Sequence, residues 1–172
     1  MKKILKFILP CLIIFILMGC ELNNTPTSKV EERLSKYQMT DKVINIDDKM
    51  QFLTDVNVLT EDQKEDYHEI VSKQYKSLSY NVKDETVDGE SAVVEVQIEV
   101  MNYKKAIDEF DLEMSYDGMH SEQYHSDRIE KLMKVKDKVT YTIEFNVNKD
   151  NDGNWKLEEL DSSIEQKILG IY

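Results

Sequence analysis

Residues 92–101, AVVEVQIEVM, decide the fold class of this chain. Apolar side chains occupy every second position from Ala92 to Val100, and Glu95, Gln97 and Glu99 stand between them. A period of two in a run rich in valine is typical of a β-strand with one face in a core and one in water. The stretch therefore predicts a long, half-buried strand.

The neighbouring sequence supplies partners for this strand. Residues 78–82 alternate in the same way, and Asp88-Gly89 provides a turn, so we expect a β-hairpin. Alternation returns over residues 139–147, residues 151–154 turn the chain, and residues 155–157 begin a return strand with Trp155 and Leu157. The sequence predicts two antiparallel hairpins separated by helical material.

Helices are expected on both sides of these hairpins. Ser28 with Glu31 has the spacing of a capping box and opens a helix over residues 29–38, and Thr60 with Gln63 opens a second one. Further helices are predicted over residues 103–114, 124–133 and 164–171, the last with Ser162 and Ser163 as caps; residues 40–58 are expected to be partly helical and partly extended, and residues 116–121 to form a loop. The pattern predicts an α+β fold, a curved antiparallel sheet packed against amino-terminal helices in a cone-like shape.

The first 19 residues differ from the rest in composition. Lys2, Lys3 and Lys6 precede an apolar run over residues 7–18 that only Pro10 interrupts. This is the arrangement of an export signal. A membrane-spanning helix needs about 20 apolar residues, so this run is too short for a spanning anchor.

The end of the run carries a more specific motif. Leu17-Met18-Gly19-Cys20 resembles the lipobox of bacterial lipoproteins, with a branched apolar residue first, a small residue third and an obligatory cysteine fourth. The resemblance implies that the Cys20 thiol receives a diacylglyceryl group and that a dedicated peptidase cuts between Gly19 and Cys20. An ordinary secretory signal that contains a cysteine, or an uncleaved anchor, is the alternative.

This motif divides the chain into a signal peptide (1–19), a lipidated tether (20–28) and one globular domain (29–172), a suitable length for a single core. Cys11 leaves with the signal and lipid consumes Cys20, so the domain has no thiol. The chain has 22 basic and 34 acidic residues, and three of the basic ones are lysines of the signal. The part after the signal therefore has 19 basic and 34 acidic residues, a formal charge of −15. Such a domain should bind no nucleic acid, and anionic headgroups should repel it so that it stands off the membrane.

The order of elements carries a second resemblance. A helical amino-terminal portion, a strand through residues 78–82, a glycine turn before Ala-Val-Val-x-Val (92–96) and a late Gly-Asn-Trp-Lys-Leu (153–157) are similar to small Gram-positive lipoproteins. Those proteins have a nuclear-transport-factor-2-like or cystatin-like domain. The resemblance covers about residues 28–172 and implies a fold that serves enzymes and binding modules alike, so it implies no activity.

One loop has the spacing of a calcium site. Residues 148–153 place oxygen-bearing side chains at alternate positions with Gly153 sixth, and Glu159 stands twelfth. However, Asn148 replaces the expected Asp, and the flanks have the pattern of strands instead of helices. We prefer a polar hairpin turn and keep a calcium-responsive surface module as the alternative.

Other reactive side chains indicate no catalytic or metal site. His68, His120 and His125 do not share a helical face and have no cysteine to complete a zinc set, so we expect them on the solvated surface. Acidic pairs such as Glu95 with Glu99 occur throughout this composition and indicate no active site.

All nine tyrosines follow the signal segment. Tyr80 and Tyr141 lie on the apolar phases of their strands, and Trp155 begins another strand. These rings either fill the core or line a cavity, and we prefer the core.

The expected function is that of a membrane-anchored lipoprotein on the extracytoplasmic face of the cell membrane. We expect a non-enzymatic protein, without cofactors, that contacts the bilayer through Cys20 and binds an unidentified protein or small ligand. An enzyme that uses a cone-shaped pocket is the alternative.

Overall fold

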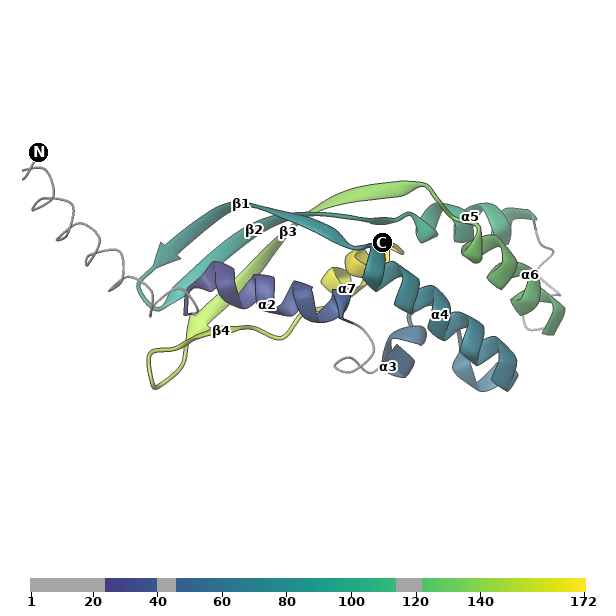
Figure 1. Ribbon diagram of the computed structural model, residues 1–172, viewed down its shortest axis with the longest axis horizontal. Coiled ribbons are helices and arrows are strands. Elements are labelled where there is room, and N and C mark those ends of the chain that lie inside the picture. The colour runs from purple at the N-terminus through teal and green to yellow at the C-terminus, as the bar shows by residue number, and fades with distance from the viewer. Residues whose placement is uncertain (1–23, 40–45, 114–121) are drawn as a thin grey trace, which may run out of the picture.

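The computed structural model describes residues 24–39, 46–113 and 122–172, and these residues form an α+β fold as predicted (Figure 1). Four antiparallel strands make an open sheet that arches over a layer of helices. In chain order the elements are α2 (Pro26–Gln38), α3 (Ile46–Met50), the 3-10 turn η2 (Val56–Val58), α4 (Glu61–Ser77), β1 (Ser79–Asp88), β2 (Ser91–Met101), α5 (Tyr103–Glu113), α6 (Glu122–Met133), β3 (Lys138–Lys149), β4 (Trp155–Leu157) and α7 (Ser162–Leu169).

The sheet is a single meander with the order β1-β2-β3-β4. Both predicted hairpins are present, and β2 pairs with β3 along its whole length, which joins them into one sheet. Ile98 at the centre of β2 lies opposite Tyr80 on one side and Tyr141 on the other. The α5–α6 pair is inserted between β2 and β3 and lies beyond the end of the sheet (Figure 1).

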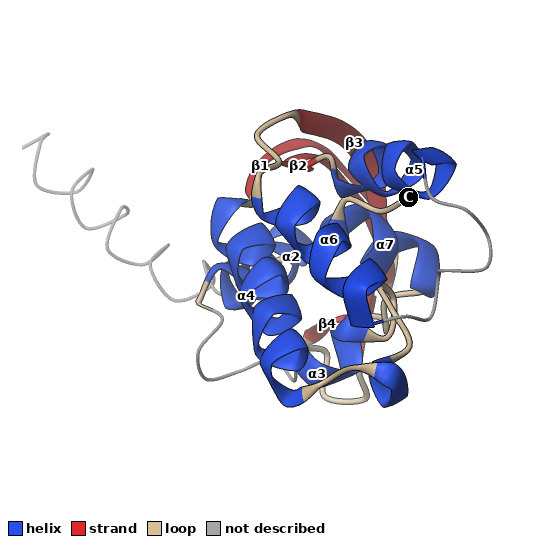
Figure 2. Ribbon diagram, turned by 90° about the vertical axis from the view of Figure 1, so that its right-hand side faces the viewer, coloured by secondary structure: helices blue, strands red, loops and turns tan. Residues whose placement is uncertain are grey.

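The helices cover one face of the sheet, as the end-on view shows (Figure 2). Val96, Ile98 and Phe145 point from the strands into the interior and are fully buried. Helix α2 buries Val30 and Leu34 against them because apolar residues recur at helical spacing on that side. The alternating pattern of residues 92–101 therefore forms the centre of the core, as the sequence predicts.

Two predicted helix starts need correction. Helix α2 begins at Pro26, and its capping box joins Thr25 to Ser28 instead of Ser28 to Glu31. Proline fits the first helical turn because it has no N–H to leave unpaired, and this moves the start three residues earlier. Helix α7 is capped by the Asp161 carboxylate, which accepts from the Ile164 N–H, so Ser162 and Ser163 lie inside the helix.

The Thr60–Gln63 capping box is present as predicted. The segments α3 and η2 confirm partly helical structure within residues 46–58. The expected loop over residues 116–121 and the first part of the 40–58 connection lie outside the described residues.

Helix α7 ends in a tightly packed turn. Gly170 adopts the left-handed conformation with φ +69°, and a Cβ at this position would lie 2.0 Å from the Met101 carbonyl oxygen. The neighbouring Gln74 side chain bridges to the backbone of Met101, accepting from its N–H at 2.9 Å and donating to its C=O at 3.1 Å. Only glycine fits here, so α4, β2 and α7 meet at a fixed distance.

Candidate functional site

The described chain begins at the hairpin end of the molecule, beside the β3–β4 turn. The Asn24 side chain accepts a hydrogen bond from the Trp155 N–H at 3.0 Å and donates to Asn154 at 3.4 Å. Thr27 donates from its backbone and its hydroxyl to one Glu85 oxygen, at 2.9 and 2.6 Å. The amino-terminal turn of α2 is thus fixed to β1 and β4, and the helix dipole favours the Glu85 carboxylate there.

The lipobox residues, Gly19 and Cys20 included, lie outside the described residues. Of the predicted 20–28 tether, Thr25 caps α2 and Pro26 begins it. Asn24, four residues after Cys20 in the sequence, is hydrogen-bonded to the β3–β4 hairpin.

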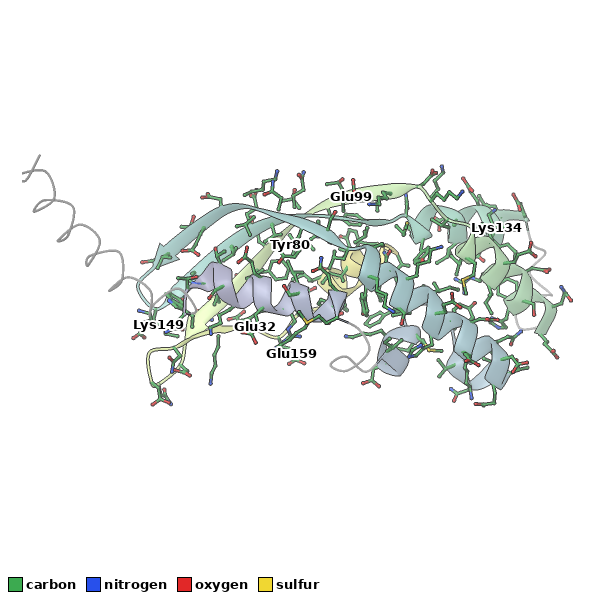
Figure 3. All side chains as sticks on the ribbon, in the orientation of Figure 1. Glu32, Tyr80, Glu99, Lys134, Lys149 and Glu159 are labelled. Carbon is green, nitrogen blue, oxygen red and sulfur yellow. The ribbon has the colours of Figure 1, made fainter. Side chains whose placement is uncertain are left out.

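A groove of about 380 Å³ lies between α2 and β4 at this end. Lys29, Arg33 and Lys36 line it from α2, where they recur at i, i+4 and i+7, and Lys156 lines it from β4. Glu32 and Asp150 are the carboxylates of the lining, and Figure 3 shows Glu32 and Lys149 in this part of the molecule. The groove has a formal excess of two positive charges in an acidic domain.

The two carboxylates of the groove are held by its cations. Glu32 pairs with Lys36 at 2.7 Å, and the pKa of Glu32 is lowered by this hydrogen bond and charge and further by Lys29 and Arg33. Asp150 pairs with Lys156 at 3.0 Å. The ammonium of Lys149 lies 5.0 Å above the Trp155 ring. Positive charge therefore dominates around both acidic groups.

The candidate calcium loop is a polar hairpin turn between β3 and β4. One oxygen of Asp150 accepts from the backbone N–H groups of Asp152 and Asn154 at 3.0 and 2.9 Å, and the other pairs with Lys156. The hydrogen bond from Asn154 is the main cause of the lowered pKa of Asp150. Gly153 takes φ +79° to close the turn. Both oxygens of this central carboxylate accept from donors of the turn or pair with Lys156. The predicted polar hairpin turn is therefore present, and the calcium-responsive module stays a prediction.

Only one of the three histidines is shown where we expected it. His68 is exposed on α4, and His120 lies outside the described residues. The surface prediction is wrong for His125, which is 3% exposed and packs edge-on against the rings of Tyr67 and Tyr124. The reason is that α6 packs against α4 through a face wider than its apolar residues alone indicate.

The interpretation of the tyrosines as core holds for those on α2, α4 and the start of α5, and only in part for the strand rings for which it was made. Tyr37 and Tyr75 are almost fully buried with ring centroids 4.8 Å apart. Tyr80 and Tyr141 are half-buried at the edge of the core, and Trp155 is 8% exposed.

Sequence reasoning missed several polar groups inside the helix layer. Arg128 on α6 is 8% exposed and donates to the Leu53 carbonyl at 2.8 Å. Glu165 on α7 is 7% exposed, pairs with Lys49 at 2.9 Å and accepts from the Tyr37 hydroxyl at 3.0 Å. Arginine and glutamate are rarely buried, and their partners come from distant segments, so no local signal marks these positions.

None of the helices in the described part of the chain combines the length and apolarity needed to cross a bilayer.

The chain matches no protein family and no curated protein sequence. Among solved structures it is similar to a "putative lipoprotein (ycdA)" from Bacillus subtilis, with 12% identity and a TM-score of 0.46. The similarity covers 87% of this chain and 49% of that structure, so the chain spans about half of the neighbour's length. The expected relation to nuclear-transport-factor-2-like or cystatin-like domains stays a prediction.

Proposed function

We propose that this protein is a lipoprotein held on the extracytoplasmic face of the cell membrane by a diacylglyceryl group on Cys20. The observation that carries the proposal is the motif Leu17-Met18-Gly19-Cys20 at the end of the basic and apolar amino-terminal run, with Asn24, four residues later, hydrogen-bonded to Trp155 of the domain.

We also propose a binding role instead of catalysis. Several buried polar side chains make contacts within the fold, as Glu165 does with Lys49 and Tyr37, and Arg128 with the Leu53 carbonyl. A hollow of about 840 Å³ opens on the surface beside η2 and the first turns of α4. It lies at the opposite end of the molecule from Asn24 (Figure 1) and faces outward when the chain is anchored at Cys20.

Two matched serine substitutions test the anchor. The parent and Cys11→Ser should incorporate labelled palmitate and partition into detergent, because Cys11 is removed with the signal. Cys20→Ser should lose the label and appear in the aqueous phase. The proposal fails if Cys20→Ser is processed at the same bond and still partitions into detergent like the parent.

The binding role has its own test at the outward hollow. A photo-crosslinking residue in place of His68, at the rim of the hollow, should give one saturable adduct on intact cells, and the same residue in place of Glu95 on the outer face of the sheet should not. Equal labelling from both positions would contradict the role of this surface.

A further inference from the structure

The groove between α2 and β4 is held in place by the packing of α2. Its formal charge is positive, whereas that of the domain is negative. Resting on the proposed Cys20 anchor, we propose that this groove, lined by Lys29, Arg33, Lys36 and Lys156, holds anionic phospholipid headgroups of the bilayer that carries the anchor. The protein is then attached at two points, the acyl chains and the groove, and its orientation on the membrane is defined.

Chain length places the groove close to the bilayer. Four residue steps separate Cys20 from Asn24, and a fully extended chain spans at most about 14 Å over that distance. Asn24 is hydrogen-bonded to Trp155 and Asn154, and both of these residues line the groove. This reach is close to the Debye length of about 8 to 10 Å at physiological salt, so headgroup charges act on the groove without full screening.

Packing of α2 fixes the direction in which its cations point. Val30, Leu34 and Tyr37 are buried, and each directly follows one of the basic residues Lys29, Arg33 and Lys36 in the sequence. The basic stripe therefore lies about 100° around the helix from the buried stripe and cannot turn inward. Lys36 and Lys156 keep 43% and 70% of their side-chain surface exposed, which leaves both ammonium groups accessible.

Charges elsewhere on the molecule favour the same orientation. On the outer face of the sheet, Glu95 lies directly opposite Asp84 on β1 and Glu144 on β3, so three carboxylates form one row. An anionic surface repels these groups and attracts the groove, which revises the expectation that the whole domain stands off the membrane.

The chain contains its own probe for this contact, because Trp155 is its only tryptophan and lines the groove. The lipidated protein is inserted into phosphatidylcholine vesicles with or without phosphatidylglycerol, both doped with a lipid that carries a spin label on its headgroup. We expect quenching of Trp155 fluorescence to be about twofold stronger in the anionic vesicles, and sodium chloride to remove the difference. Equal quenching in both vesicles at low salt would overturn the proposal.

Two quadruple variants with the same change in net charge complete the experiment. Lys29→Gln/Arg33→Gln/Lys36→Gln/Lys156→Gln should lose the difference between the vesicles. The control Lys104→Gln/Lys105→Gln/Lys131→Gln/Lys134→Gln, on α5, α6 and the turn after α6, should keep it. Loss of the difference in both variants would show a net-charge effect and would contradict a groove contact.

Two further measurements separate the possible failures. Flotation with neutral vesicles reports the anchor alone, so a protein that fails to float disproves the lipidation and not the groove contact. Inorganic phosphate should reduce the difference no more than chloride of equal ionic strength. A specific effect of phosphate would assign the groove to a soluble anion and overturn the membrane contact.

Discussion

The two layers of this fold bury different chemistry. The residues that β1–β4 bury completely are aliphatic or aromatic without a hydroxyl, as at Val96, Ile98 and Phe145. The buried polar side chains among the described residues all come from helices; they are Gln63, Gln74, His125, Arg128 and Glu165, together with Tyr37, Tyr67, Tyr75, Tyr103 and Tyr124. The sheet layer thus depends on apolar packing, and the helix layer also contains buried hydrogen bonds such as that from the Tyr37 hydroxyl to Glu165.

Alkaline pH should expose this difference most strongly. Burial raises the pKa of Tyr37, Tyr75 and Tyr103 well above the ordinary value of 10.0. Because the unfolded chain ionises first, stability is complete below about pH 10 and falls as the pH rises above it. At about pH 11 the three groups should together remove about 4 kcal/mol from the free energy of unfolding.

Urea unfolding at about pH 8 and about pH 11 measures this loss. Tyr75→Phe removes one of the three ionisable groups, so the free energy of unfolding should fall less between the two pH values than it does in the parent. An equal free energy of unfolding at both pH values would contradict a helix layer that depends on buried hydroxyls.

The sheet layer should respond most to a loss of volume. Ile98 is fully buried, and Ile98→Ala should cost about 3 kcal/mol because it leaves a cavity between paired strands. Val93 lies on the outer face of the same strand with 37% exposure, so Val93→Ala should change the free energy by less than about 0.5 kcal/mol. Chemical denaturation of the two variants provides the comparison, and similar costs would mean that β2 does not bury the face described here.

Removal of one buried donor should affect the helix layer by an intermediate amount. Arg128→Met keeps much of the side-chain length but leaves the Leu53 carbonyl without its donor, so we expect a loss of about 2 kcal/mol. Lys131→Gln, on the same helix and with ion pairs no shorter than 3.6 Å, should cost less than about 1 kcal/mol. Urea midpoints test the pair, and an Arg128→Met protein as stable as the parent would show that this hydrogen bond contributes nothing.

The smallest effect should distinguish two neighbouring tyrosines. The Tyr75 hydroxyl has no hydrogen-bond partner among the described residues, so Tyr75→Phe should stabilise the protein by up to about 1 kcal/mol at neutral pH. Tyr37→Phe should destabilise it by about 1 kcal/mol, because the Tyr37 hydroxyl donates to the buried Glu165 carboxylate. Thermal unfolding of both variants gives the sign, and a shift in the same direction would refute the assignment.

The sheet layer can be predicted from the sequence more completely than the helix layer. A period of two needs only local information, so the alternation of residues 92–101 and 139–147 predicted both strands and their inner faces. In α6 the polar His125 and Arg128 adjoin the apolar Tyr124 and Ile129, and local pattern alone cannot show that packing extends over all four. The start of α2 could have been predicted from Pro26, which marks a first helical turn.

The basic residues of the groove can be predicted from the sequence only in part. The spacing of Lys29, Arg33 and Lys36 is visible in the sequence of α2, and a stripe could be predicted from it. Lys156 joins the stripe only because the meander places β4 beside α2, which is a tertiary contact. The sequence therefore predicts the basic residues on the α2 side of the groove but not Lys156 on the β4 side.

The attachment of α2 also determines when the domain can finish folding. Asn24 binds Trp155 across 131 sequence positions, and Tyr37 binds Glu165 across 128. Helix α2 is therefore completed by contacts with residues that are synthesised late, and loops of this length close slowly. The proposed export of an unfolded chain would benefit from this order, because α2 cannot reach its final structure before the strand and helix that complete it have been synthesised.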